Sequence, residues 1–161
     1  MGRATWRGWV WAMGMAVLAV ALSSIPYAVG YLAQAPDSVF VGAVYDWEDY
    51  YSHLAKMQQG MRGEWQYRIL FTSEEHSGAY INPFYLALGH VAGMLGLSPA
   101  VIYHAARVVA GLGLLLVVYG FVVYFVRNER TRKLAFFLAC FSSGLGWLVL
   151  LATRSYTLAG I

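Results

Sequence analysis

Charged residues are scarce in this sequence: they make up only 12% of its 161 residues, while 60% of the residues are hydrophobic. A soluble domain usually has about twice that charged fraction. The apolar residues lie in blocks long enough to cross a bilayer, which takes roughly 20 residues. A soluble core would show shorter amphipathic periods instead. The composition therefore predicts an all-α, polytopic membrane protein.

Cysteine and clustered histidine are also lacking. The single cysteine, Cys140, excludes an intrachain disulfide, and the four histidines are scattered along the chain. A structural zinc site would need more ligands than this. Asp49 and His53 form an i,i+4 pair suited to a metal ion, but no further ligand follows at a matching spacing. The sequence therefore predicts no cofactor and does not indicate a divalent metal.

The apolar blocks predict about three transmembrane helices, over residues 9–32, 99–126 and 134–152. A cleavable signal peptide is the rival interpretation of the first block, because Ala33-Gln34-Ala35 resembles a cleavage site. However, this apolar run has about 24 residues, whereas the apolar core of a signal peptide has roughly 7–15. The length favours an uncleaved helix.

The distribution of charge predicts the orientation. Residues 33–79 contain seven acids and three bases, whereas residues 127–133 contain four bases and one acid. Because basic residues favour the cytoplasmic side, the N-terminus and the 127–133 loop are expected inside, and residues 33–79 outside. Because the N-terminus and the 127–133 loop are expected on the same side, an even number of membrane crossings must lie between them. Residues 80–97 are therefore predicted to form a juxtamembrane or short inserted helix, with a fourth full span as the open alternative.

Within the outer loop, residues 47–61 have the spacing of an amphipathic helix. The apolar stripe consists of Trp47, Tyr50, Leu54, Met57 and Met61. The opposite face consists of Asp46, Asp49, His53 and Lys56. We expect this helix to lie flat on the membrane surface, with its acids toward water or a cavity.

Two features could take part in chemistry. An acid of this helix is suited to act as a general base, and a solvated face with helix-capping acids is the alternative. Arg107 lies about eight residues inside its apolar block. An arginine at that depth can bind an anionic lipid phosphate or extend toward the interface, and the sequence leaves both interpretations open.

The order of these features resembles the N-terminal part of C-type (GT-C) glycosyltransferases, which include protein O-mannosyltransferases and aminoarabinose transferases. The matching residues are Asp46 and Asp49, Gly63-Glu64-Trp65, Pro83-Phe84-Tyr85, Gly96-Leu97-Ser98 and Ala106-Arg107. The likeness is closer to uncharacterised bacterial membrane proteins with a Tyr-Leu-Ala-x-Met-like run followed by Gly-x-Trp, and the run here is His53-Leu54-Ala55-Lys56-Met57. Relatives often pair Asp and Glu directly, but Trp47 separates Asp46 from Glu48 in this sequence.

The resemblance implies transfer of a sugar from a polyprenyl-phosphate donor to a hydroxyl on the outer face of a bacterial inner membrane. It implies Asp49, or Asp46 in the other register, as the catalytic base, with Arg107, Glu48 and His53 binding substrate. The expected partners are membrane lipid, the lipid-linked donor and the rest of the same polypeptide beyond residue 161, but no nucleic acid. The alternative is a non-enzymatic multi-pass protein, such as a transporter subunit or assembly factor.

Overall fold

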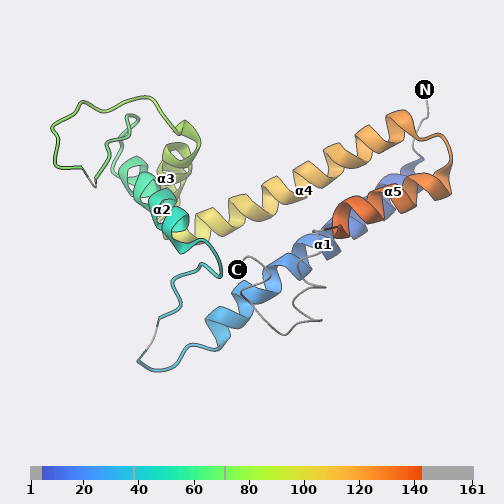
Figure 1. Ribbon diagram of the computed structural model, residues 1–161, viewed down its shortest axis with the longest axis horizontal. Coiled ribbons are helices and arrows are strands. Elements are labelled where there is room, and N and C mark those ends of the chain that lie inside the picture. Colours follow the sequence, from blue (N-terminus) through green and yellow to red (C-terminus); the bar gives the residue numbers. More distant parts are fainter. Residues whose placement is uncertain (1–4, 38, 71, 143–161) are drawn as a thin grey trace. The chain divides into compact units, whose positions relative to one another are not determined.

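The computed structural model describes residues 5–37, 39–70 and 72–142, and this part of the chain is all-helical, without a β-strand (Figure 1). The helices are α1 (Trp6–Leu32), α2 (Trp47–Met61), α3 (Pro83–Leu95), α4 (Pro99–Phe125) and α5 (Glu129–Phe141). The chain divides into two compact units. One contains the start of α1, the end of α4 and α5, and the other contains residues 20–111.

Helices α1 and α4 are long and apolar enough to cross a membrane, by length and composition. Each has 27 residues, with a mean hydropathy of 1.8 for α1 and 2.4 for α4 in the most apolar window. At a rise of about 1.5 Å per residue, each spans roughly 40 Å, which exceeds the ~30 Å hydrocarbon core. Only 11% of each window is buried. Most of the surface of these two apolar helices is therefore not covered by the described part of the chain.

Helix α3 is shorter than the apolar block that contains it. Pro83 occupies its first turn, where a missing backbone N–H costs nothing, and Gly96 ends it at φ 65°. Thirteen residues reach only about 20 Å, which is less than the hydrocarbon core. By length, α3 is a shorter apolar helix and not one of the two candidate membrane spans of the described chain.

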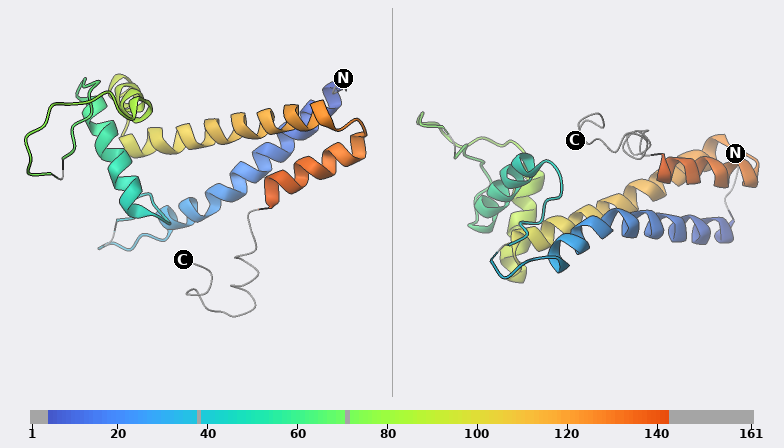
Figure 2. Two further views of the ribbon diagram at one scale, coloured as in Figure 1. Left: turned by 45° about the horizontal axis from the view of Figure 1, so that its top comes forward. Right: turned by 60° about the horizontal axis from the view of Figure 1, so that its bottom comes forward.

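In the unit of residues 20–111, α2 and α3 pack closely against each other, as Figure 2 shows. Two glycines make the contact possible, because a Cβ on Gly60 would overlap the Leu86 carbonyl and a Cβ on Gly89 would overlap the Met57 carbonyl. The Gly60 carbonyl also accepts a hydrogen bond from His90 Nδ1. These backbones lie closer together than two helices with larger residues could.

The 62–82 connection is fixed to α2 by a buried side chain. The Gln59 amide donates to the Arg68 carbonyl at 2.8 Å and accepts from the Arg68 N–H at 2.9 Å. One isolated bridge pairs Tyr67 with Ala79. The Gln59 side chain thus makes the same pair of hydrogen bonds that the backbone of a neighbouring β-strand would make.

In the other unit, an aromatic core joins the ends of α1 and α4 to α5. Tyr119 and Phe136 are fully buried there and meet edge-on, with ring centroids 5.2 Å apart. Trp9 contacts Tyr119, and Trp11 contacts Phe136. Trp9 and Trp11 therefore pack on protein through edge-on ring contacts.

The basic loop predicted at residues 127–133 is shorter in the structure, because α5 already begins at Glu129. Asn128 caps the helix by accepting hydrogen bonds from the N–H groups of Arg130 and Thr131. Arg132 is 5% exposed and donates to the carbonyl of Val126, at the end of α4. The predicted helix at 134–152 therefore starts earlier than expected, and its part beyond residue 142 lies outside the described residues.

Candidate functional site

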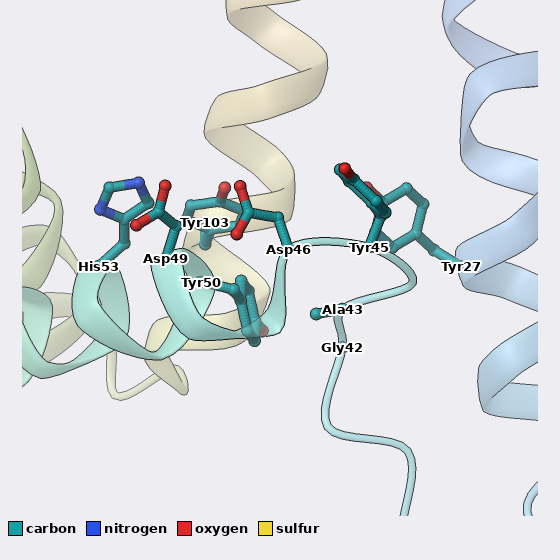
Figure 3. Close-up of a pocket in the computed structure, with 9 residues that line it drawn as sticks. All are labelled: Tyr27, Gly42, Ala43, Tyr45, Asp46, Asp49, Tyr50, His53 and Tyr103. Carbon is teal, nitrogen blue, oxygen red and sulfur yellow. The ribbon is translucent and has the colours of Figure 1, made fainter. Parts of the chain in front are cut away.

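A cleft of about 150 Å³ lies at the N-terminal end of α2 (Figure 3). We call it the acidic cleft, and its lining residues are Tyr27, Gly42, Ala43, Tyr45, Asp46, Asp49, Tyr50, His53 and Tyr103. They come from α1, the following loop, α2 and α4, all within the unit of residues 20–111. The cleft thus brings together residues that are far apart in the sequence.

Both predicted catalytic acids line this cleft. Asp46 and Asp49 are exposed, and their carboxylates project from the same side of α2 as the His53 ring (Figure 3). Neither carboxylate has an ion-pair partner among the residues that the structure describes. Both acids therefore remain available to a ligand.

Asp46 immediately precedes α2 and has a left-handed backbone, with φ 52° and ψ 51°. An aspartate in this conformation is strained by roughly 1–3 kcal/mol. Its side chain makes no capping hydrogen bond to the helix. The expectation that the acids serve as helix caps is therefore not met at Asp46.

The polar face of α2 is only partly solvated. His53 stacks on Tyr85 of α3, with ring centroids 4.0 Å apart and an interplanar angle of 11°. Lys56 lies over the rings of Tyr67 and Tyr85, at 5.6 and 5.7 Å. The sequence placed His53 and Lys56 opposite the apolar stripe, but α3 and the 62–82 connection cover them.

The ends of the predicted apolar stripe are less buried than its centre. Tyr50 and Met57 are buried, whereas Trp47 is 60% exposed and Met61 is 41% exposed. The pattern correctly places a helix over 47–61. However, both ends of the stripe are exposed, so the stripe as a whole is not an internal face.

The electrostatics of the cleft leave its imidazole and its buried phenol neutral near pH 7. Burial lowers the pKa of His53 below its ordinary value and the nearby Lys56 adds to this, while Asp49 and Asp46 act in the opposite direction. Burial also raises the pKa of Tyr50 to about 12, with smaller contributions from neighbouring tyrosines. The two carboxylates are therefore the charged groups of the cleft.

Arg107 lies beside the acidic cleft and does not line it. Its guanidinium donates to Ser24 Oγ at 2.9 Å and lies 4.3 Å from the centre of the Tyr27 ring. It lines two other cavities, of about 170 and 540 Å³. The larger one is mostly apolar, with Val101, Ala105, Val108 and Val109 in its wall. Arg107 is thus bound to α1, an arrangement that neither interpretation of the sequence included.

No family model matches this chain, and neither a curated protein nor a solved structure matches it. The site therefore rests on its own geometry. Of the predicted site residues, Asp46, Asp49 and His53 come together in the acidic cleft. Arg107 is separated from it by Tyr27 and Tyr103, which line both the cleft and the cavities around Arg107, while Glu48 is exposed outside the lining.

The tyrosines of the cleft were not identified as site residues from the sequence. Tyr50 was interpreted as part of an apolar stripe, and Tyr27, Tyr45 and Tyr103 were not assigned to a site. The available signal was the abundance of the residue type, since the chain has 12 tyrosines. Their convergence depends on tertiary contacts that no local spacing contains.

The lowered pKa of His53 predicts a loss of stability in acid. Between its folded pKa and the unfolded value of about 6.5, the unfolded chain binds more protons than the folded one. The free energy of unfolding should therefore fall as pH drops below about 6.5, by less than about 1.4 kcal/mol per pH unit. His53→Phe, which keeps a ring against Tyr85, should show a shallower fall.

The measurement is chemical unfolding of the full chain in detergent, followed by circular dichroism between pH 5 and 7.5. His76→Phe is the matched control, because His76 is exposed and its ring bonds only to backbone in its own loop. An identical pH dependence for the wild type and His53→Phe would contradict the prediction.

Proposed function

We propose that the chain belongs to a multi-pass bacterial inner-membrane protein that transfers a sugar from a polyprenyl-phosphate donor to an acceptor hydroxyl on the outer face. The observation that carries the proposal is that the carboxylates of Asp46 and Asp49 line one cleft and have no ion-pair partner among the described residues. Transfer to a hydroxyl needs a base to accept its proton, and an exposed carboxylate beside the substrate can act in this way.

In the proposed reaction, the acceptor's hydroxyl oxygen attacks the anomeric carbon while Asp49 accepts the proton of that hydroxyl. The bond from that carbon to the phosphate oxygen breaks, and the lipid phosphate leaves with the electron pair. Negative charge grows on the leaving phosphate, so a nearby cation stabilises the transition state. Arg107 is the cation suited to this, with the apolar cavity beside it suited to the first units of the lipid chain.

In this role the guanidinium of Arg107 bonds to two partners, Ser24 of α1 and the lipid phosphate. Its Nη2 bonds to Ser24 Oγ, whereas its Nε is buried without a hydrogen-bond partner within the described part of the chain. A guanidinium has five N–H donors, so the contacts with α1 leave donors for a phosphate. Ser24 and Tyr27 would then position the side chain.

The direct test is transfer by the full-length protein in proteoliposomes. A radiolabelled polyprenyl-phosphate sugar should lose its label to a hydroxyl acceptor and release polyprenyl phosphate in equal amount. If neither product forms with any of several donors and acceptors, the non-enzymatic alternative is favoured.

The proposed orientation predicts which loops an impermeant thiol reagent can reach. In a Cys140→Ser background, Ser77→Cys should label strongly in intact cells, because the 33–79 segment is expected outside. Thr131→Cys should label only after the cells are opened. Thr131 is exposed and uncharged, so this substitution preserves both the Asn128 cap and the basic residues. Strong labelling of Thr131→Cys in intact cells would reverse the assignment.

A further inference from the structure

A further cavity, of about 350 Å³, lies in the 62–82 connection, within the unit of residues 20–111. We call it the loop cavity, and its lining residues are Glu64, Trp65, Gln66, Arg68 and Tyr80. Its volume is within the range of roughly 300–1,000 Å³ that is typical of small-molecule sites. The sugar transfer proposed above uses none of these side chains.

The backbone pairing in the connection turns three of these side chains to one face. Tyr67 and Ala79 exchange two backbone hydrogen bonds, of 2.9 and 3.1 Å. Tyr67 is 4% exposed, and its ring packs toward α2. Because neighbouring residues of an extended pair point to opposite faces, the side chains of Gln66, Arg68 and Tyr80 should point away from α2. All three are exposed and line the loop cavity, as this alternation predicts.

Gly78 keeps this face free of a further side chain. A Cβ at Gly78 would lie 2.8 Å from the Gln66 Cβ and 3.5 Å from the Arg68 Cγ. The first distance is shorter than carbon atoms in van der Waals contact allow. A larger residue at this position would therefore displace the two lining side chains or cover them. With glycine there, both side chains are left open to a ligand.

The polar groups of the loop cavity are balanced in charge. The described residues of its lining include one carboxylate, Glu64, one guanidinium, Arg68, and one amide, Gln66. These three side chains make no ion pair or hydrogen bond within the described part of the chain. Together they offer several N–H donors and several oxygen acceptors. A ligand that satisfies both kinds of group has donors and acceptors of its own and no net charge.

The aromatic side chains of the loop cavity are also open. Tyr80 is 75% exposed and Trp65 is 51% exposed. The two faces make up most of the surface of a phenol ring, so this exposure leaves at least one face of Tyr80 uncovered. Trp65 meets the His90 ring at an interplanar angle of 79°, with centroids 4.1 Å apart, which holds the indole against α3. Rings of this kind supply rigid contact area at a low cost in conformational entropy.

We propose that the loop cavity binds a neutral saccharide. A pyranose ring has a face of C–H groups, which packs on the electron-rich face of an aromatic ring, and a rim of hydroxyls, each of which donates and accepts hydrogen bonds. The cavity supplies both kinds of surface. An apolar ligand would leave the polar lining groups unpaired, which costs free energy. The inference concerns binding alone and does not rest on sugar transfer.

The test uses the full-length protein in phosphatidylcholine nanodiscs, because a maltoside detergent would itself present a sugar. The probes are maltose, cellobiose and diacetylchitobiose, with saturation-transfer NMR of their ring protons as the readout. Sorbitol is the control, because it has the hydroxyls without a rigid C–H face. We expect at least one disaccharide to bind roughly tenfold more tightly than sorbitol, since only a ring can stack on the aromatic side chains. No binding by any of the three, or equal binding of sorbitol, would overturn the proposal.

Aromatic variants locate the binding. Trp65→Leu and Tyr80→Leu should each weaken binding of the tightest disaccharide several-fold, because leucine keeps apolar volume but has no ring face. Tyr51→Leu makes the same change at an exposed tyrosine outside the loop cavity and should leave binding unchanged. Circular dichroism checks that each variant keeps its helix content. A loss with Tyr51→Leu as large as with Tyr80→Leu would overturn the assignment to this cavity.

A pair of arginine variants tests the polar part of the lining. Arg68→Gln removes the guanidinium but keeps the two hydrogen bonds to Gln59, because these use the backbone of Arg68. Arg62→Gln is the matched control, because Arg62 is exposed and does not line the cavity. We expect several-fold weaker disaccharide binding for Arg68→Gln alone, since it loses charge-assisted hydrogen bonds. Equal binding by both variants would overturn the proposed role of Arg68. The titrations contain neither donor nor acceptor, so a failed transfer assay does not affect their outcome.

Discussion

Replacement of Asp49 with asparagine is expected to lower sugar transfer by about 10²–10⁴-fold, the range typical of general base catalysis. Asparagine keeps the size of the side chain but cannot accept the acceptor's proton. Because Asp49 is exposed and has no ion-pair partner in the described part of the chain, the change should leave the fold intact. Donor binding should change far less, since the lost interaction belongs to the transition state.

The measurement is kcat and KM for transfer by the full-length protein, with Asp37→Asn as the matched control. Asp46→Asn should have a milder effect than Asp49→Asn. The reverse order would assign the base to Asp46, which immediately precedes α2 in a left-handed conformation. Changes of less than about threefold in both variants, far below the general-base range, would leave the cleft without a catalytic role.

Addition of a methyl group at Gly60 or Gly89 should disrupt the contact between α2 and α3. In each case the new Cβ would overlap a backbone carbonyl, of Leu86 or Met57, which cannot move aside as a flexible side chain can. Overpacking of this kind typically costs about 1–3 kcal/mol. We therefore expect Gly60→Ala and Gly89→Ala each to lower the free energy of unfolding by about this amount.

Gly113→Ala is the control, because it lies within α4 and a Cβ there would have no neighbour within 4 Å. Alanine is the better helix former by about 1 kcal/mol, so this variant should be as stable as the wild type or more stable. Thermal unfolding in detergent, followed by circular dichroism, compares the three. A Gly89→Ala variant as stable as Gly113→Ala would show that α2 and α3 are not closely packed.

The sequence predicted the helices well where local pattern decides them. The amphipathic spacing placed a helix over residues 47–61, where α2 lies, and the apolar block at 99–126 corresponds to α4. Pro83 and Gly96 lie at the ends of α3, because proline starts a helix readily and glycine ends one in the left-handed region. The predicted start of the last helix, at residue 134, was wrong, because Asn128 caps α5 and the helix begins at Glu129.

The site was predicted only in part. Asp46, Asp49 and His53 recur at intervals of three and four on one helix, so their proximity follows from local geometry. By contrast, Arg107 contacts Ser24 and Tyr27, and Ser24 lies 83 positions away in the sequence. No periodicity encodes such a pair. For the same reason Tyr45 and Tyr103 could not be assigned to the cleft.

The double hydrogen bond between Gln59 and the backbone of Arg68 has a mechanical consequence. One side chain of α2 bonds both the N–H and the carbonyl of a single loop residue. A rotation of α2 about its axis should therefore move the loop with it. A spin label at Gln66, next to the bridged Tyr67, would therefore report the orientation of α2 in place of independent loop motion. Gln59→Leu would uncouple them, and the label's spectrum would narrow while α2 stayed helical.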